Sequence, residues 1–339
     1  MKDAVVLIPS YEPDDLLVNT VTELVKNDFP VLVVNDGSGP EFEHIFEEVK
    51  PIVKYLSYEK NKGKGAAMKY GYSKLLELYP DAKYVITADG DGQHALKDII
   101  RVYDKLVETN ELVFGVREFG KDVPFRSRFG NDFSKTTRSL LTKTYIQDDQ
   151  CGLRGFPIRY LLILIKTPGN RYEYEMNQIT AFQMSQVPMY TLPIETIYLD
   201  SNSRSHFSPF KDTFRIQTII FLHSIAAIVT NILLAFMIIV GLNHHVMPSI
   251  GVVYLSYTIA FLLYFLYINI AYPTPRFFRR LFKELLFVAI KMETCHLMVL
   301  LTIDVLHWNV FAMVPIIVLM CCSLNVLFSW LLRKMFPTF

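Results

Sequence analysis

The stretch Tyr84–His94, YVITADGDGQH, joins an apolar run to two aspartates and an amide. The run Tyr84–Ala88 is typical of a buried parallel strand. Asp89, Asp91 and Gln93 follow it directly, and their oxygen atoms are ligands suited to Mg²⁺ or Mn²⁺. The intervening glycines allow the backbone to turn sharply and to approach a ligand closely. The stretch therefore predicts a metal site at the carboxyl end of a strand.

Two other interpretations of this stretch compete with the metal site. Asp and Gly are ordinary turn residues, so the acids could simply cap the helix that follows. A calcium-binding EF-hand loop would need Glu at its twelfth position, where this sequence has Ile100, and a helix before the loop. The neighbouring segments favour the metal interpretation more than the stretch itself does.

Strand-like and helix-like segments alternate on either side of this stretch. We expect strands at Ala4–Ile8, Val31–Val34, Ile52–Leu56, Tyr84–Ala88 and Glu111–Gly115, and helices at Asp14–Lys26, from about Asn61–Gly65, and at Leu96–Val107. This alternation predicts an open, mostly parallel sheet with helices on both faces. Ligands of such sheets bind beyond the carboxyl ends of the strands. Pro9–Glu12 and Asn35–Ser38 should therefore lie at the same edge as Asp89 and Asp91.

The common nucleotide-binding fingerprints are missing from this sequence. There is no GxxxxGK[ST] string, and Gly63-Lys64-Gly65 is followed by Met68 where a dinucleotide fingerprint needs its third glycine. Neither an ATPase nor a dehydrogenase is supported. Lys64 is either a cation delivered close to a phosphate or a solvated loop lysine. Asp36 either accepts hydrogen bonds from a base or ribose or belongs to a simple turn.

Seven short motifs follow one another in the first half of the chain. They are IPSYEP at Ile8–Pro13, VNDGSG at Val34–Gly39, NKGKGAA at Asn61–Ala67, ADGDGQH at Ala88–His94, Arg117, PFRSRFGN at Pro124–Asn131 and DDQCGLRGF at Asp148–Phe156. In this order they resemble family 2 glycosyltransferases, and more narrowly the polyprenyl-phosphate sugar synthases that include dolichol-phosphate mannose synthase. The resemblance covers residues 1–210 and implies a glycosyltransferase-A domain, a Rossmann-like α/β fold with a mostly parallel sheet.

The resemblance also implies roles for individual residues. The nucleotide would be held by Pro9, Tyr11, Glu12, Asp36, Lys64 and Asp89, and Mg²⁺ or Mn²⁺ by Asp89, Asp91 and Gln93. The reaction centre would contain Asp91, Asp148 and Arg154. The diphosphate or acceptor phosphate would be bound by Arg117, Arg126, Arg128, Arg204 and His206, since arginine presents a planar fork to phosphate. His206 stands where related enzymes have lysine, so its charge depends on pH.

The two halves of the chain differ in charge and hydropathy. Hydrophobic residues make up 51% of the sequence, and its mean hydropathy is +0.26. From Phe214 onward eight Lys and Arg face three Asp and Glu, a net charge of +5, whereas the first 213 residues carry 26 against 30, a net of −4. The four cysteines match neither a disulfide framework nor a zinc site, which fits a reducing compartment. The first 30 residues show no signal-peptide pattern, so the first half should remain where it is made.

The second half contains four long apolar stretches. They cover residues 216–240, 250–271, 285–303 and 311–332, and each is long enough to cross ~30 Å of hydrocarbon. Lys and Arg lie before the first stretch, between the second and third, and after the fourth, so both termini and the enzyme domain are expected in the cytoplasm. Residues 211–339 thus predict an all-α four-helix transmembrane domain, which resembles GtrA-like domains. Lys291, Glu293 and His296 inside the third stretch have either a lipid-phosphate or transport role or a structural one between helices.

Together these features predict a multi-pass enzyme of the plasma membrane. We expect inverting transfer of one sugar from a nucleotide-diphosphate sugar, UDP-glucose first, to a polyprenyl phosphate such as undecaprenyl phosphate, for cell-envelope glycans. The QxxRW motif of processive synthases is missing, since tryptophan occurs only at Trp308 and Trp330. We expect no nucleic-acid partner, and the membrane domain leaves room for a homo-oligomer. A flippase for lipid-linked sugars and a transferase to a non-lipid acceptor are the alternatives.

Overall fold

The computed structural model describes residues 1–117, 151–185, 187–195, 229–230, 232–243, 248–271, 277–301 and five single positions between 309 and 327. Several predicted site residues lie outside this part of the chain, namely Arg126, Arg128, Asp148, Arg204 and His206. The start of the first predicted membrane span and most of the fourth also lie outside it.

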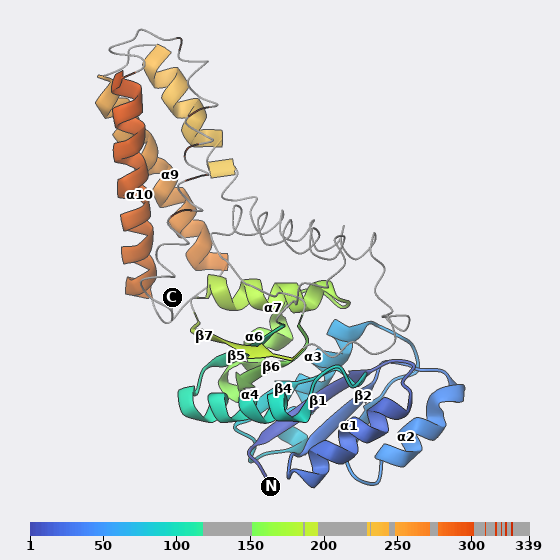
Figure 1. Cartoon of the computed structure of the whole chain (residues 1–339). Coiled ribbons are helices and arrows are strands. Elements are labelled where there is room, and N and C mark those ends of the chain that lie inside the picture. The colour runs from blue at the N-terminus through green and yellow to red at the C-terminus, as the bar shows by residue number, and fades with distance from the viewer. Residues whose placement is uncertain are drawn as a thin grey trace.

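The first half of the chain is built on one seven-stranded sheet with the order β3-β2-β1-β4-β6-β5-β7 (Figure 1). The strands are β1 Ala4–Ser10, β2 Val31–Asn35, β3 Lys54–Ser57, β4 Tyr84–Thr87, β5 Leu112–Arg117, β6 Arg154–Pro157 and β7 Met189–Ile194. All neighbouring strands are parallel except β6, which runs antiparallel to both β4 and β5. The predicted α/β domain with a mostly parallel sheet is confirmed, and the five predicted strands lie close to their observed bounds.

Helices cover both faces of this sheet, as the alternation predicted. They are α1 Asp15–Lys26, α2 Glu43–Val49, α3 Lys64–Leu78, α4 Leu96–Thr109, α6 Leu161–Lys166 and α7 Glu173–Met184, with single 3₁₀ turns at Pro40–Phe42 and Ile158–Tyr160. One core packs α1, α2 and α4 against Val6 and Ile8 of β1, and the other packs α3, α6 and α7 against Val5 and Leu7. Successive residues of a strand point to opposite faces, so a strand covered on both sides must be apolar throughout.

Two long helices, α9 Ser249–Ala271 and α10 Phe277–Val299, pack side by side in the second half of the chain. They follow a shorter apolar helix at Ile232–Asn243. A small core joins them, in which Val253 and Tyr257 of α9 are buried with Cys295 of α10. Many other large apolar side chains on the pair are exposed, among them Leu262, Leu266, Ile270, Leu285 and Leu297. Within the described residues, α9 is the one helix that is long and apolar enough to cross a membrane.

The third predicted span overlaps helix α10, whose bounds differ from the predicted ones. Helix α10 begins at Phe277, whereas the apolar stretch was expected to begin at Leu285. Arg279, Arg280 and Lys283, which were expected in a loop, therefore belong to the first turns of this helix. Hydropathy does not reveal this basic first part of the helix, in which Arg280 is buried at the junction with the α/β domain.

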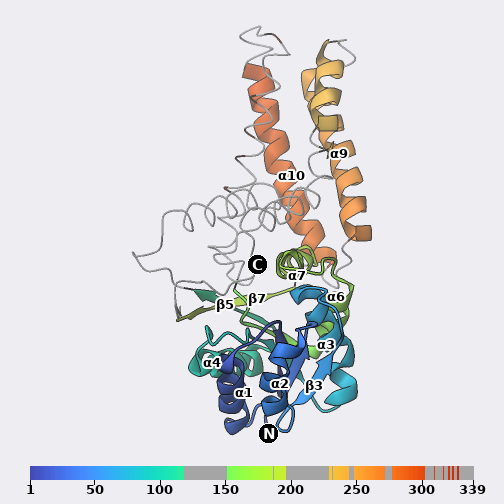
Figure 2. The same ribbon diagram turned by 90° about the vertical axis from the view of Figure 1, so that its right-hand side faces the viewer.

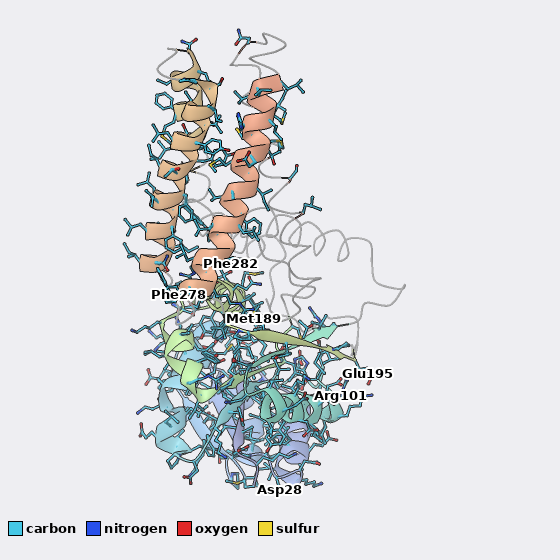
Figure 3. The ribbon with its side chains drawn as sticks, turned by 90° about the vertical axis from the view of Figure 1, so that its left-hand side faces the viewer. Asp28, Arg101, Met189, Glu195, Phe278 and Phe282 are labelled. Atoms are coloured by element: carbon cyan, nitrogen blue, oxygen red, sulfur yellow. The ribbon has the colours of Figure 1, made fainter. Side chains whose placement is uncertain are left out.

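Arg280 joins the helical pair to the α/β domain. Its guanidinium donates hydrogen bonds to the Ile268 carbonyl at 3.3 Å, to Asn269 Oδ1 at 3.2 Å, and to the carbonyl of Met184. Met184 is the last residue of α7 and Ile268 lies in the last turn of α9, so one cation binds the carbonyl ends of two helices. The pair stands over α7 on this contact (Figure 2). Phe278 and Phe282, both largely exposed, lie at the same end of α10 (Figure 3).

Candidate active site at the edge of the sheet

The carboxyl ends of β1 and β2 are tied together by hydrogen bonds. Asp36 N donates to the Ser10 carbonyl at 2.8 Å, and Glu12 N donates to Ser38 Oγ at 2.9 Å. Ser38 N in turn donates to Asn35 Oδ1 at 2.8 Å. Pro9, Tyr11 and Glu12 thus lie beside the segment that carries Asp36. The two polar strand ends meet at one edge of the sheet, as the parallel pairing requires.

Asp36 is almost completely buried and organises the loop before α3. Its carboxylate accepts hydrogen bonds from the Tyr58 hydroxyl, from Asn61 Nδ2 at 3.1 Å and from the backbone N–H groups of Lys62 and Gly63 at 2.9 Å each. Burial, followed by this contact with Asp36, raises the pKa of Tyr58 well above its usual value. Gly37 has φ +72°, and a Cβ there would lie 2.4 Å from Asn61 N, so the close approach needs glycine. Asp36 is therefore more than a turn residue, and its contact with a nucleotide remains a prediction.

Lys64, the first residue of α3, bridges two carboxylates. Its Nζ lies 2.6 Å from Asp89 Oδ1 at the end of β4 and 3.0 Å from Glu175 Oε1 in α7. Burial favours the neutral amine, but the charges of Asp89 and Glu175 outweigh it and raise the pKa of Lys64. The side chain is 18% exposed, so Lys64 is not a solvated loop lysine. It is a cation fixed at the predicted diphosphate position.

Asp89 is enclosed from two further sides. His94 Nε2 lies 3.5 Å from Asp89 Oδ2, and a Cβ on Gly152 would lie 2.4 Å from that same oxygen. Burial opposes ionisation of Asp89, but Lys64 and His94 together hold the pKa of this carboxyl well below its usual value. Burial and the negative charge of Asp89 raise the pKa of Asp91. The two aspartates thus differ in pKa, and Asp89 ionises more readily than Asp91.

The aspartates do not cap the helix that follows them. The residue before α4 is Ala95, which makes no side-chain capping hydrogen bond, so the capping interpretation is wrong. Asp91 Oδ1 instead accepts a hydrogen bond from Gln93 N at 3.1 Å, which closes a tight local turn. The EF-hand alternative also fails, because Ile100 lies inside α4 after a strand–turn entry.

The residues at this edge fit a divalent cation that has other ligands as well. Among the described residues, no three His, Cys, Asp or Glu side chains gather closely enough to form a metal cluster. Mg²⁺ usually takes only one or two protein carboxylates and fills its remaining positions with water and phosphate oxygens. Asp89 and Asp91 supply that number, with the Gln93 amide beside them. The donor set therefore suits a metal that arrives together with a diphosphate.

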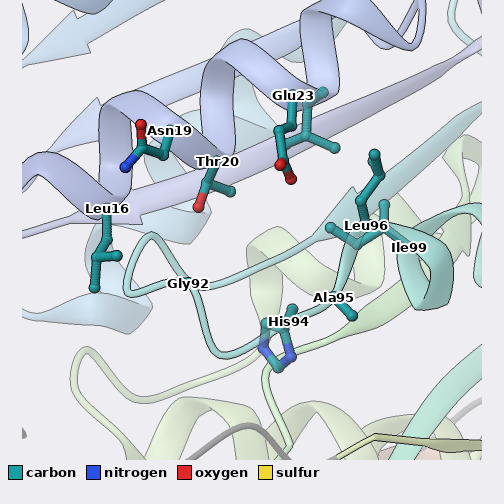
Figure 4. A pocket seen from close by; sticks show the side chains of 10 residues that line it. Leu16, Asn19, Thr20, Glu23, Gly92, His94, Ala95, Leu96 and Ile99 are labelled. Carbon is teal, nitrogen blue, oxygen red and sulfur yellow. The ribbon is translucent and has the colours of Figure 1, made fainter. Parts of the chain in front are cut away.

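A pocket of about 210 Å³ lies between α1 and the first turn of α4 (Figure 4). Helix α1 contributes Asn19 and Thr20 to its lining, the segment leading into α4 contributes Gly92 and His94, and α4 itself contributes Leu96. Asp89 does not line this pocket. The pocket therefore lies next to the candidate site and does not contain it.

The two predicted arginines in the described part of the chain occupy different places. Arg117 ends β5. Arg154 begins β6 and is buried, and its guanidinium donates to the Cys151 carbonyl at 2.9 Å, the Glu175 carbonyl at 2.7 Å and Gln178 Oε1 at 3.0 Å. The Arg154 guanidinium also lies over the Phe114 ring, 5.4 Å from its centroid. These contacts hold α7 against the sheet, and the expected place of Arg154 near the sugar stays a prediction.

Sequence reasoning missed three residues of this site. Glu175 carries no signal, because it lies in a helix that was not predicted and more than a hundred residues after Lys64. His94 and Gly152 lay within quoted motifs but received no role. The spacing of the motifs could not show that all three residues meet around Lys64 and Asp89.

Comparison with known proteins decides the family. Residues 5–163 match the family described as glycosyl transferase family 2. An uncharacterized protein of Methanocaldococcus jannaschii is 32% identical over 168 residues, which are 46% of this chain and 72% of the relative. The chain belongs to glycosyl transferase family 2. This family 2 chain is therefore a glycosyltransferase.

Two further proteins are similar to this family 2 transferase. The UDP-N-acetylglucosamine–dolichyl-phosphate N-acetylglucosaminyltransferase of Methanococcus voltae is 29% identical over 217 residues, 57% of this chain and 85% of the relative. A solved structure of glucosyl-3-phosphoglycerate synthase from Mycobacterium tuberculosis, in complex with Mn²⁺, UDP-glucose and phosphoglyceric acid, has a TM-score of 0.47 and 14% identity. That alignment covers 64% of this chain and 77% of the solved one.

Proposed function

We propose that this transferase moves one sugar from a UDP-hexose to a polyprenyl phosphate, with inversion at the anomeric carbon. The observation that carries the proposal is the attachment of a family 2 domain, through buried Arg280, to a helical pair with exposed apolar side chains. With a lipid acceptor, the apolar helices would hold the enzyme domain beside the membrane that contains its substrate. The Methanococcus voltae relative, named for a UDP-sugar donor and a dolichyl-phosphate acceptor, supports the same pairing.

The donor would lie along the edge where β1, β2 and β4 end. Pro9, Tyr11, Glu12 and Asp36 would face the nucleoside, and Lys64 would neutralise part of the diphosphate charge. Asp89, Asp91 and Gln93 would hold Mg²⁺ or Mn²⁺. Such an ion offsets the charge that develops on the leaving diphosphate. We propose a UDP-linked hexose as the donor sugar and expect glucose as the first candidate. The name of the Methanococcus voltae relative adds N-acetylglucosamine as a second candidate.

The acceptor would be anionic before it reacts. A phosphate oxygen is already ionised at neutral pH, so attack on the sugar needs no strong general base. The harder task is to hold two anions together, and Arg117, Arg126, Arg128, Arg204 and His206 are the cations we assign to it. Asp148 would orient the sugar.

The membrane part of the proposal concerns residues 211–339. We propose four spans of the GtrA-like type, with the enzyme domain on the cytoplasmic side of the plasma membrane. The length and composition of α9 support it, as do the exposed Phe278 and Phe282 at the end of α10 next to the α/β domain, because exposed apolar side chains suit burial at the boundary of a bilayer. Residues 1–210 would then reach the lipid phosphate from the interface.

The test is an assay of the full-length protein in detergent or lipid. UDP- and GDP-sugars are offered with undecaprenyl phosphate and Mg²⁺ or Mn²⁺, and the lipid-linked sugar is detected by mass. We expect product from a UDP-hexose, and we expect EDTA and Asp91→Ala each to lower the rate at least about 100-fold, since metal stabilisation contributes several kcal/mol.

Two alternative functions predict different outcomes of this assay. A flippase would form no lipid-linked sugar from any donor, because it transports a finished product and needs no metal motif. A transferase to a non-lipid acceptor would release UDP without forming a lipid product, and a chain ending at residue 210 would be as active as the whole. Either result would overturn the proposed acceptor.

A further inference from the structure

Lys64 has two anionic partners that belong to different parts of the molecule. Asp89 ends β4 in the predicted metal loop, at 2.6 Å, whereas Glu175 lies in α7, at 3.0 Å. Only Asp89 is an expected metal ligand. Lys64 is therefore shared between Asp89, which the metal would need, and Glu175, which it would not.

Glu175 is held firmly where it meets Lys64. Its side chain is 8% exposed, and its backbone carbonyl accepts a hydrogen bond from buried Arg154 at 2.7 Å. Helices α3 and α7 are in close contact, because a Cβ on Gly65 would lie 2.4 Å from Tyr174 Cβ. The residues following Lys64 and preceding Glu175 thus touch, so the ion pair is built into the packing of the two helices.

Two cations held by one carboxylate repel each other, and the repulsion is strong where water is excluded. If a divalent ion binds Asp89, the hold of that carboxylate on the Lys64 ammonium is weakened. Without a second carboxylate, Lys64 would lose its compensation in a largely buried place and would compete with the ion for Asp89. Glu175 removes that competition, since it can keep the ammonium beside the diphosphate position.

We propose that Glu175 is a positioning residue of the donor site, which retains Lys64 when Asp89 turns from Lys64 to the metal. The inference rests on the proposed function, because it takes the donor to be a diphosphate that binds with a divalent ion. It makes the affinity for metal and UDP depend on a residue that touches neither of them.

The test measures UDP binding to the full-length protein by calorimetry at several Mn²⁺ concentrations. Glu175→Gln keeps the shape of the side chain and removes its charge. We expect the Mn²⁺ concentration at half-saturation with UDP to rise about tenfold, the size typical of coupling within one charged network. Glu173→Gln is the matched control on the same helix, because its amide oxygen can still accept from Asn170 N, and it should change the value less than twofold.

A second pair of variants separates positioning from a general loss of structure. Lys64→Gln should weaken UDP binding about tenfold, and adding Glu175→Gln to it should change the affinity less than twofold, since no ammonium is left to retain. If Glu175→Gln melts too early to be measured, Glu175→Asp keeps the charge one methylene farther from Lys64 and should show a smaller shift of the same sign.

Each remaining result overturns the inference. Unchanged Mn²⁺ dependence in Glu175→Gln, or an equal loss in the presence and absence of Lys64, means that Glu175 does not act through Lys64. If the wild-type protein makes lipid-linked sugar while the Glu175 variants have the same Mn²⁺ dependence of UDP binding as the wild type, the inference fails and the proposed function stands. If the wild-type protein binds no UDP with either metal, both fail.

Discussion

The α/β domain and the α9–α10 pair use apolar residues in opposite ways. In the domain, strand residues such as Leu7 are completely buried, whereas Leu262 of α9 is 58% exposed. The charged side chains of Asp36, Lys64 and Asp89 lie together at one edge of the domain's sheet. The pair has only a small shared core, around Val253 and Cys295. The domain folds by burying its apolar side chains away from water, and the exposed apolar surface of the pair is what the proposed membrane location would require.

The largest expected effect separates the two regions by stability. Leu7→Ala should lower the free energy of unfolding by about 3 kcal/mol, because it leaves a cavity between β1 and α3. Leu262→Ala should change it by less than about 0.5 kcal/mol, because it removes an exposed side chain. Guanidinium unfolding in detergent micelles measures both. An equal loss in the two variants would show that α9 packs against protein along its exposed face.

The junction between the regions should carry the next largest effect. Arg280→Ala leaves the carbonyls of Met184 and Ile268 without their shared donor, at a cost of about 2 kcal/mol in docking. Transfer to polyprenyl phosphate should fall about tenfold, because in the proposed function the helical pair presents the acceptor to the domain. UDP affinity should stay within twofold, since Arg154 holds the other end of α7.

The control for this variant is Arg279→Ala, which removes the neighbouring positive charge from the same helix. Radiolabelled transfer and UDP calorimetry separate the two readouts. Equal losses of transfer and UDP affinity in Arg280→Ala would mean that the regions do not divide acceptor and donor binding between them.

Inside the domain, the edge of the sheet should be sensitive to a single methyl group. Gly152→Ala puts a Cβ against the Asp89 carboxylate, which Lys64 and His94 already enclose. We expect transfer to fall about tenfold, equivalent to about 1.4 kcal/mol, with little change in melting temperature. In Gly39→Ala the new Cβ meets only the flexible end of Glu41, and activity should be retained. A Gly152→Ala enzyme with normal rates would show that Asp89 has room to move.

The smallest effect concerns a helix end that faces water. Asp14 accepts a hydrogen bond from Leu16 N at 2.9 Å at the start of α1, and Asp14→Ala should cost about 1 kcal/mol of stability. Asp15→Ala removes a first-turn acid that makes no cap, so about 0.3 kcal/mol is expected. Thermal melts of the two variants compare them directly. Equal melting temperatures in the two variants would show that the Asp14 cap adds no stability beyond that of a first-turn acid.

Much of the fold could be predicted because its signals are local. Apolar runs such as Val31–Val34 fix strands, and the helical spacing of Leu17, Val21 and Leu24 fixes α1. The later elements β6, β7, α6 and α7 were not predicted. Strand β6 is only four residues long and antiparallel, and α7 buries polar residues such as Asn177 and Gln178, so neither has a clear periodicity. The early start of α10 was missed because its first turns are basic.

The sequence by itself determined the α/β class, the family and the edge at which Asp36, Lys64, Asp89 and Asp91 gather, because strand order and parallel pairing carry local motifs to one place. The tertiary structure alone decided which charges touch. Glu175 reaches Lys64, and Arg154 and Arg280 hold the two ends of α7, through helix packing between residues far apart in the chain. No spacing in the sequence encodes those distances, because they depend on how the side chains of two cores fill space.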